Sequence, residues 1–205
     1  MKRVAFAILV MVGSSAAFAQ APKGWKMRVD RSASASDPDA PGSIKFMAMG
    51  GGLHFVNPQA AVFWNPANRA SGAYTVKGTF TLMKPSGHTN YYGLVFGGSD
   101  LDGAQQKYAY FLVAQDGTYL VKKRDGDATA DVVKKTPSDA VKKPGGDGKS
   151  TNALEVRVAA DKIDYVVNGK VVTSTPKGDL RTDGVYGIRI NHLLEVMVDG
   201  FSVSK

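Results

Sequence analysis

Short runs of alternating apolar and polar residues, separated by glycine-containing turns, constrain the fold of this chain more than any other feature. The clearest run is GAYTVKGTFTLM at Gly72–Met83, where every second residue from Tyr74 onward is apolar or glycine. Successive side chains of a β-strand point to opposite faces, so a period of two predicts a half-buried strand. No long run with helical period follows the first nineteen residues. The sequence therefore predicts an all-β protein.

Two dipeptides predict the tightest connections between strands. Asn168-Gly169 and Asp116-Gly117 each stand between two alternating runs. Both dipeptides favour the positive φ angles of a type I′ turn, so we expect a hairpin at each. Turn signals recur every 8–12 residues or so, which is typical of sandwiches and barrels. With roughly twelve to fourteen expected strands, the favoured architecture is a two-sheet antiparallel jelly-roll sandwich.

The first nineteen residues resemble a signal peptide rather than a part of the fold. Met1-Lys2-Arg3 is positively charged, the apolar run Val4–Ala17 follows, and Ala17-Phe18-Ala19 has the small-x-small pattern of a cleavage site. A membrane anchor is the alternative, but a spanning helix needs about 20 apolar residues. We therefore expect export to the periplasm or the extracellular space, with cleavage near Ala19.

The remaining chain is expected to form one domain. Residues 20–43 are expected to hold an N-terminal strand and a loop, and residues 44–205 the sandwich itself. No other segment is apolar and long enough to span a bilayer, so we expect no membrane span in the mature chain. The chain contains no cysteine, which excludes disulfides, thiolate catalysis and cysteine metal sites.

The charge of the chain bears on its partners. The formal net charge is +8 at pH 7, and removal of Lys2 and Arg3 would take away two of these charges. The remaining lysines occur as scattered pairs rather than along a helix or between exposed aromatic residues, so nucleic-acid binding is not indicated. A solvated basic surface is the favoured interpretation, and attraction to an anionic envelope polymer is the alternative.

Several motifs, taken together, carry a family resemblance. They are Gly93–Gly97 (GLVFG), Tyr108–Asp127 (YAYFLVAQDGTYLVKKRDGD), Asn152–Val158 (NALEVRV), Ile163–Val172 (IDYVVNGKVV), Gly184–Ile190 (GVYGIRI) and Val198–Val203 (VDGFSV). In this order they resemble secreted bacterial domains of the concanavalin A-like lectin/glucanase superfamily. The resemblance covers about residues 44–205. It is greatest to uncharacterised one-domain members and to 3-keto-disaccharide hydrolase-like domains.

This resemblance implies a jelly-roll sandwich with carbohydrate as the ligand class. It also implies glycoside hydrolysis of the 3-keto-disaccharide hydrolase-like type as an alternative function. The Phe-Asn-Gly-rich opening expected of that hydrolase-like branch is represented only by Lys23-Gly24-Trp25.

The carboxylates argue against glycoside hydrolysis, which uses two of them around the scissile bond. Glu155 is expected to face outward beside Arg157 as a surface pair. Glu195 and Asp199 share one face of a strand, but at about 3.3 Å per residue their backbones are about 13 Å apart. Catalytic pairs lie about 5–9.5 Å apart. We therefore expect binding without catalysis.

The sequence gives only partial metal motifs. Asp100 and Asp102 are two residues apart and precede Gly103, as at the start of a calcium loop, but no third carboxylate or later glutamate follows. A polar loop without a cofactor is the favoured interpretation, with calcium as the alternative. The three histidines, His54, His88 and His192, have no metal-ligand spacing, although distant strands could bring them together.

A carbohydrate site needs an aromatic floor and a few fixed polar groups. If Ile188 and Ile190 face the core, Arg189 and Asn191 must face out of the sandwich, where tyrosines of neighbouring strands could form a floor. The predicted carbohydrate-binding residues are Trp64, Tyr92, Tyr110, Arg189, Asn191 and His192. In the alternative interpretation the tyrosines are partly buried core residues and Arg189 pairs with an acidic neighbour.

Three functions therefore remain after the sequence is considered. The first is an exported domain that binds carbohydrate or another envelope glycan without catalysis. The second is a glycoside hydrolase of the kind that the resemblance implies. The third is a structural or interaction protein whose sandwich has no small-molecule site.

Overall fold

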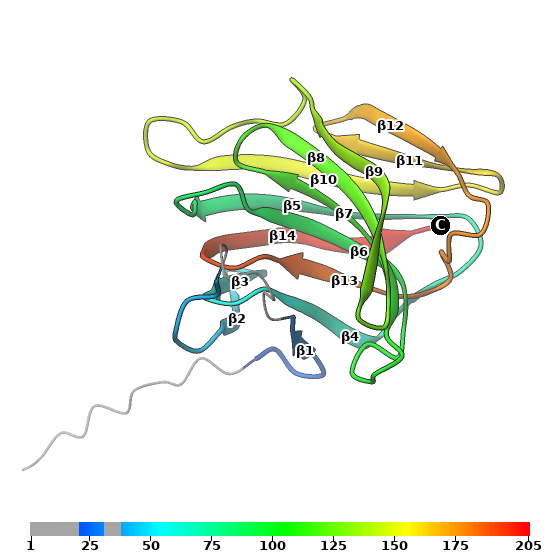
Figure 1. Cartoon of the computed structure of the whole chain (residues 1–205), viewed down its shortest axis with the longest axis horizontal. Coiled ribbons are helices and arrows are strands. Elements are labelled where there is room, and N and C mark those ends of the chain that lie inside the picture. Colours follow the sequence, from blue (N-terminus) through cyan, green and yellow to red (C-terminus); the bar gives the residue numbers. More distant parts are fainter. Residues whose placement is uncertain (1–20, 31–37) are drawn as a thin grey trace, which may run out of the picture.

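The computed structural model describes residues 21–30 and 38–205, and these residues form two antiparallel sheets packed face to face (Figure 1). The predicted all-β jelly-roll sandwich is confirmed. The expected signal peptide, residues 1–19, lies outside the described residues. Residues 21–30 and 38–205 contain no helix long and apolar enough to cross a membrane.

Each sheet contains seven strands drawn from distant parts of the chain. Sheet A is ordered β1 (Lys26–Val29), β4 (Ala61–Ala70), β13 (Gly184–Ile190), β6 (Tyr91–Ser99), β7 (Lys107–Ala114), β8 (Thr118–Asp125) and β9 (Ala128–Pro137). Sheet B is ordered β12 (Lys170–Pro176), β11 (Lys162–Val167), β10 (Ser150–Val158), β5 (Tyr74–Lys84), β14 (Leu194–Ser204), β3 (Gly52–Asn57) and β2 (Lys45–Met49).

The alternation along β5 accounts for the core. Every second residue from Tyr74 to Leu82 is buried, with Tyr74, Val76, Phe80 and Leu82 in the core, and the residues that alternate with them are partly or fully exposed on the outer face. The inner faces of both sheets meet in one hydrophobic cluster. Burial of this apolar area is the main stabilising term for a chain without disulfides.

The N-terminal segment is part of the sandwich. β1 pairs antiparallel with β4 as an edge strand of sheet A. Trp25, just before β1, packs edge-on against Phe46 with ring centroids 5.4 Å apart, and it also contacts Phe201. The first strand of the sandwich therefore lies within the stretch 20–43 that precedes the predicted domain.

One predicted turn type is confirmed and the other is wrong. Asn168 and Gly169 have φ angles of 51° and 81°, as a type I′ turn requires. At the other hairpin only Gly117 has a positive φ, 85°, and its amide donates to the carbonyl of Ala114. Asp116 instead accepts hydrogen bonds at Oδ1 from the amide and hydroxyl of Thr118. Asp116 is not among the residues with a positive φ, so Gly117 alone supplies the left-handed residue of a longer turn.

β4 extends further than its local sequence indicates. Asn65-Pro66 is typical of the end of a strand, but β4 continues to Ala70. Gly187 of β13 pairs with Trp64 and Val185 pairs with Arg69, so residues 65–68 are an insertion opposite a single residue. Pro66 is tolerated there because a bulge leaves residues outside the hydrogen-bonded ladder.

Candidate functional site

Arg189 lies on the outer face of sheet A, as the alternation in β13 predicts. Its neighbours Ile188 and Ile190 are in the core between the sheets. Gly93 of β6 stands directly opposite Arg189 in the ladder, and it has no side chain to fill the space above the strand. The long Arg189 side chain reaches past β6 to β7, where its guanidinium carbon lies 5.2 Å from the centroid of the Tyr110 ring.

The guanidinium of Arg189 is held by an acidic partner. Nη1 donates to Oδ2 of Asp30 at 2.5 Å and to the hydroxyl of Tyr108 at 3.1 Å. Burial alone would lower the pKa of Arg189, but Tyr108 and Asp30 outweigh it and raise that pKa above its usual range. The cation–π contact and the ion pair together fix this arginine as a permanent cation.

Asp30 serves two arginines at once. Nη1 of Arg124, on β8, donates to the same Oδ2 at 2.7 Å. Arg189 is only 9% exposed, and the side chains of Arg124 and Asp30 are 11% and 14% exposed. The structure therefore matches the alternative interpretation of Arg189, that it pairs with an acidic neighbour, and leaves little of its charge accessible to a ligand.

The structure brings three of the six predicted residues together. Trp64, Tyr110 and Arg189 share the outer face of sheet A, where Trp64 and Tyr110 are 3% and 5% exposed. Burial raises the pKa of Tyr110 to about 12, although Arg189 acts in the opposite direction. Their low exposure makes this a packed aromatic face rather than an open floor.

The other three predicted residues lie elsewhere. Tyr92 is fully buried between the sheets, and its hydroxyl accepts a hydrogen bond of 3.4 Å from Asn152. Asn191 is partly buried just after β13, where its backbone N–H donates to the backbone carbonyl of Tyr91. His192 is buried, with Nδ1 3.1 Å from Asp39 and Nε2 3.0 Å from Nε2 of His88.

The two aspartates of the calcium-like loop have protein partners. Asp100, at φ 49°, accepts the backbone amide of Gln105 on Oδ2 at 3.0 Å. Asp102 pairs with Lys26 at 2.6 Å, which lowers the pKa of its carboxyl. Within residues 21–30 and 38–205, no three side chains of the His, Cys, Asp and Glu types converge as a metal site.

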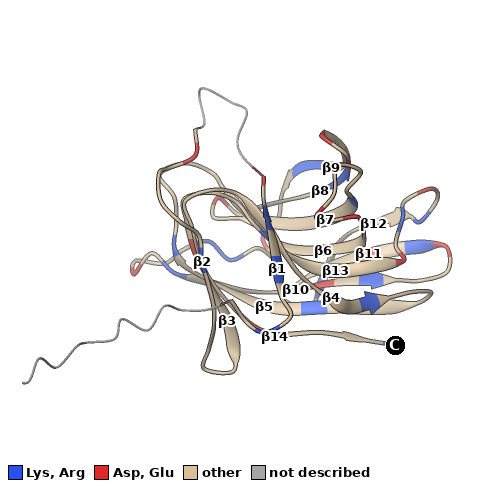
Figure 2. Cartoon of the chain, turned by 90° about the horizontal axis from the view of Figure 1, so that it is seen from below, with Lys and Arg blue, Asp and Glu red and all other residues tan. Residues whose placement is uncertain are grey.

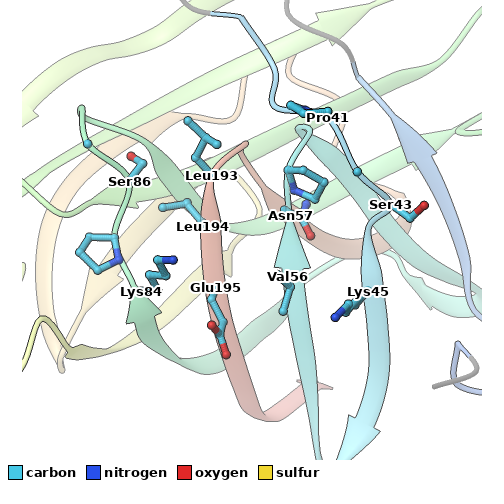
Figure 3. A pocket seen from close by; sticks show the side chains of 14 residues that line it. Pro41, Ser43, Lys45, Val56, Asn57, Lys84, Ser86, Leu193, Leu194 and Glu195 are labelled. Atoms are coloured by element: carbon cyan, nitrogen blue, oxygen red, sulfur yellow. The ribbon is translucent and has the colours of Figure 1, made fainter. Parts of the chain in front are cut away.

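The outer face of sheet B carries an open groove of about 550 Å³ that sequence reasoning did not identify (Figure 3). Four neighbouring strands, β2, β3, β14 and β5, supply its base. Their register aligns Lys45, Val56, Glu195 and Lys84 in one row across the sheet. Loops around Pro41–Ser43, Pro85–Gly87 and Leu193 form the rim.

The groove combines apolar and polar side chains. Leu193 on the rim is 36% exposed, and Val56 lies on the base beside Glu195. Glu195 is fixed by His54, whose Nε2 lies 2.9 Å from Oε1, and its side chain remains 33% exposed. The groove therefore offers an oriented carboxylate acceptor, lysine donors and an apolar surface.

The groove has no sequence signature because its members are single residues from four separated strands. An isolated lysine on an alternating strand is normally a solvated position. The only available signal was that Glu195 faces outward on β14, opposite the core residues Leu194 and Val196. Charged residues as a class are spread over both sheets, so charge does not single out the groove (Figure 2).

Comparison with known proteins places the fold. No protein-family model and no curated protein matches this sequence. Among solved structures, the carbohydrate-binding module CBM66 from Bacillus subtilis is similar, with a TM-score of 0.62 and 14% identity over 89% of this chain and 96% of that one. A GH16 protein of a Bacteroides ovatus mixed linkage glucan PUL, in complex with a G4G4G3G product, has a TM-score of 0.61 and 6% identity over 88% and 94% of the two chains.

A third similar structure is a Bacillus subtilis protein of unknown function with a galectin-like fold, with a TM-score of 0.53 and 16% identity over 88% of this chain and 89% of that one. At these identities the likeness establishes the fold. This chain shares the jelly-roll sandwich of these structures.

Proposed function

We propose that this protein is an exported glycan-binding module without catalytic activity, and that the groove on sheet B receives the glycan. The observation that carries this proposal is the row Lys45–Val56–Glu195–Lys84 at the base of an open groove of about 550 Å³. Binding sites for small ligands are concave, mostly apolar, and oriented by a few polar groups. The similarity in fold to a carbohydrate-binding module supports the same ligand class.

The chemistry of the groove suits a sugar. The C–H face of a pyranose ring packs against an apolar surface, which Leu193 and Val56 supply. Sugar hydroxyls donate to a carboxylate and accept from ammonium groups, which Glu195 and Lys84 supply. Glu195 is held by His54, so its carboxylate is oriented before a ligand arrives and less conformational entropy is lost on binding.

The number of carboxylate side chains in the groove favours binding over hydrolysis. Among the described residues that line the groove, Glu195 is the one carboxylate. Glycosidases need a pair, about 5–5.5 Å apart for retention and about 6.5–9.5 Å for inversion. The hydrolase-like alternative would need a second acid to approach Glu195 within that range.

Export is part of the proposal on sequence grounds. The pattern of residues 1–19 is that of a cleaved signal peptide. N-terminal sequencing of the protein recovered outside the cytoplasm tests this part. An N-terminus near Gln20 is expected, and an intact Met1 in the membrane fraction would contradict it.

A glycan-array screen tests the binding proposal, followed by titration of any glycan that binds. Glu195→Gln and Lys84→Met should each weaken binding by about tenfold, because each removes a charge-assisted hydrogen bond of about 1.5 kcal/mol. The matched control is Glu155→Gln. Glu155 lies on β10 of the same sheet, outside the groove, and pairs with Arg157 at 2.8 Å.

The outcomes separate the candidate surfaces. An equal loss of glycan affinity in Glu155→Gln and Glu195→Gln would contradict the proposal that the groove binds the glycan. If a folded Arg189→Lys variant loses glycan affinity while Glu195→Gln retains it, the glycan binds on the outer face of sheet A instead. A protein that binds no glycan on the array would favour the structural or interaction alternative.

A further inference from the structure

Two histidines converge at the end of the sandwich, beside the groove rim. His88 comes from the loop between β5 and β6, and His192 from the turn between β13 and β14. Their Nε2 atoms lie 3.0 Å apart, and Nδ2 of Asn90 lies 3.0 Å from the same nitrogen of His88. His192 and Asn90 are 4% and 2% exposed, whereas His88 is exposed. Two of the three groups at the point of convergence are therefore buried, and the third is exposed.

Asp39 determines how His192 presents its ring. Its Oδ1 lies 3.1 Å from Nδ1 of His192. An ionised carboxylate only accepts hydrogen bonds, so Nδ1 carries the proton in the neutral ring. In that tautomer the lone pair is on Nε2 of His192, which lies 3.0 Å from Nε2 of His88. A carboxylate on the far nitrogen is the arrangement that orients histidine ligands of metal ions.

The spacing of the two nitrogens fits a shared metal ion. Zinc–imidazole distances are about 2.0–2.1 Å, so two nitrogens bound to one ion lie about 3.0 Å apart at a right angle and about 3.4 Å apart in a tetrahedron. The Nε2–Nε2 distance of 3.0 Å is within this range. Imidazole ligands select zinc, copper and nickel over the hard cations calcium and magnesium.

Asn90 can supply a third ligand. The oxygen and nitrogen of a side-chain amide exchange places by a half-turn. The hydroxyl of Ser86 now accepts from Nδ2 at 3.2 Å, and after the half-turn it would donate to the amide oxygen instead of to the carbonyl of His88. With the amide turned, its oxygen would take the place of Nδ2, which lies 3.0 Å from Nε2 of His88.

We propose that His88 and His192 bind a divalent transition-metal ion of the zinc class, with the side-chain oxygen of Asn90 as a further ligand. Asp39 is a positioning residue that keeps Nε2 of His192 unprotonated. The ion would link the β5–β6 loop to the β13–β14 turn and stabilise both. This inference is independent of glycan binding.

Calorimetric titration of the purified, tag-free protein with ZnCl₂ tests the site, and Co²⁺ provides a spectroscopic probe. We expect one ion per chain, visible d–d absorption from bound Co²⁺, and a higher melting temperature with Zn²⁺. His88→Gln should abolish all three, and its exposure means that the fold should tolerate the change. Asp39→Asn should weaken the affinity by about 10–100-fold, because it removes the carboxylate that orients His192.

His54→Gln is the matched control, since His54 pairs with Glu195 rather than with another histidine. It should bind Zn²⁺ as the unaltered protein does. The proposal is overturned if the unaltered protein binds neither ion. It is also overturned if His88→Gln retains the Co²⁺ spectrum, or if the affinity is lost in His54→Gln instead.

Discussion

Asp30 and Arg189 are separated by 159 positions in the chain, yet they form an ion pair on the outer face of sheet A. The same carboxylate oxygen binds Arg124, so one acid compensates two poorly exposed cations. The pair connects the segment after β1 to the centre of the sheet. Loss of this ion pair should therefore lower the free energy of unfolding of the whole sandwich.

Asp30→Asn should lower the free energy of unfolding by about 3 kcal/mol, because removal of one partner leaves a buried charge uncompensated. Urea denaturation measures this change. Asp102→Asn is the control, since Asp102 also pairs with a cation of the N-terminal segment, Lys26, but both of these side chains are more than half exposed. It should have no measurable effect. Equal stability of the two variants would show that the ion pairs of Asp30 with Arg189 and Arg124 do not stabilise the fold.

Gly97→Ala should destabilise the protein more than Gly50→Ala. Both glycines are left-handed, with φ angles of 64° and 59°, so each alanine carries a backbone cost of about 1 kcal/mol. A Cβ at Gly97 would also lie 2.1 Å from the carbonyl oxygen of Arg181, whereas one at Gly50 meets nothing within 4 Å. Overpacking of this kind costs about 1–3 kcal/mol. Thermal and urea unfolding of both variants measure the difference, and equal losses would contradict the close approach of β6 to residue 181.

Stability should fall steeply in strong alkali. Burial raises the pKa of Tyr165 to about 12, from about 10 in an unfolded chain. Because the folded-state pKa is the higher one, the stabilisation is complete below about pH 10 and is lost as the pH rises to about 12. For Tyr165 this change amounts to about 3 kcal/mol of the free energy of unfolding over this pH range.

The Tyr165→Phe variant checks this assignment. It keeps the aromatic ring in the core and removes the ionisable hydroxyl, whose contact with Thr175 is long, at 3.4 Å. Between about pH 9 and pH 12 its unfolding free energy should fall less steeply than that of the unaltered protein. Parallel curves for the two proteins would exclude Tyr165 as a source of the alkaline loss.

Binding of an acidic glycan should depend on salt, because Lys45 and Lys84 flank Glu195 in the groove. Each exposed lysine contributes up to about 1 kcal/mol to the attraction, which corresponds to about fivefold in affinity. Concentrated NaCl should remove this contribution, whereas a neutral glycan of the same length should be unaffected. Titrations of both glycans at low and high NaCl test this, and equal salt dependence would exclude a role for the lysines.

The fold could be predicted because its determinants are local. The alternation in β5 specifies which face is buried, and Asn168-Gly169 specifies a two-residue hairpin. The turn at Asp116-Gly117 was predicted in position but not in type. The backbone of Asp116 does not adopt a positive φ, and its side chain accepts a hydrogen bond from the amide of Thr118. The continuation of β4 beyond Pro66 depends on β13 and was therefore not visible locally.

The candidate sites were less predictable because they depend on register between distant strands. Alternation correctly places Arg189 on the outer face, but nothing near it in sequence identifies Asp30 as its partner. Tyr92 precedes a glycine in β6, and its direction depends on which face of the strand is buried. The groove and the His88–His192 pair each require strands that are remote in sequence to be adjacent in space.

The position of β14 has a consequence for when the chain can fold. This last strand lies in the middle of sheet B, between β5 and β3, and not at an edge. A polypeptide from which β14 is still missing has a gap at the centre of that sheet, between β5 and β3, and cannot close its core. The sandwich therefore cannot form until β14 has been synthesised, and long-range pairing of this kind is slow. The export proposed above would benefit from that delay, because a narrow translocation channel requires an unfolded chain.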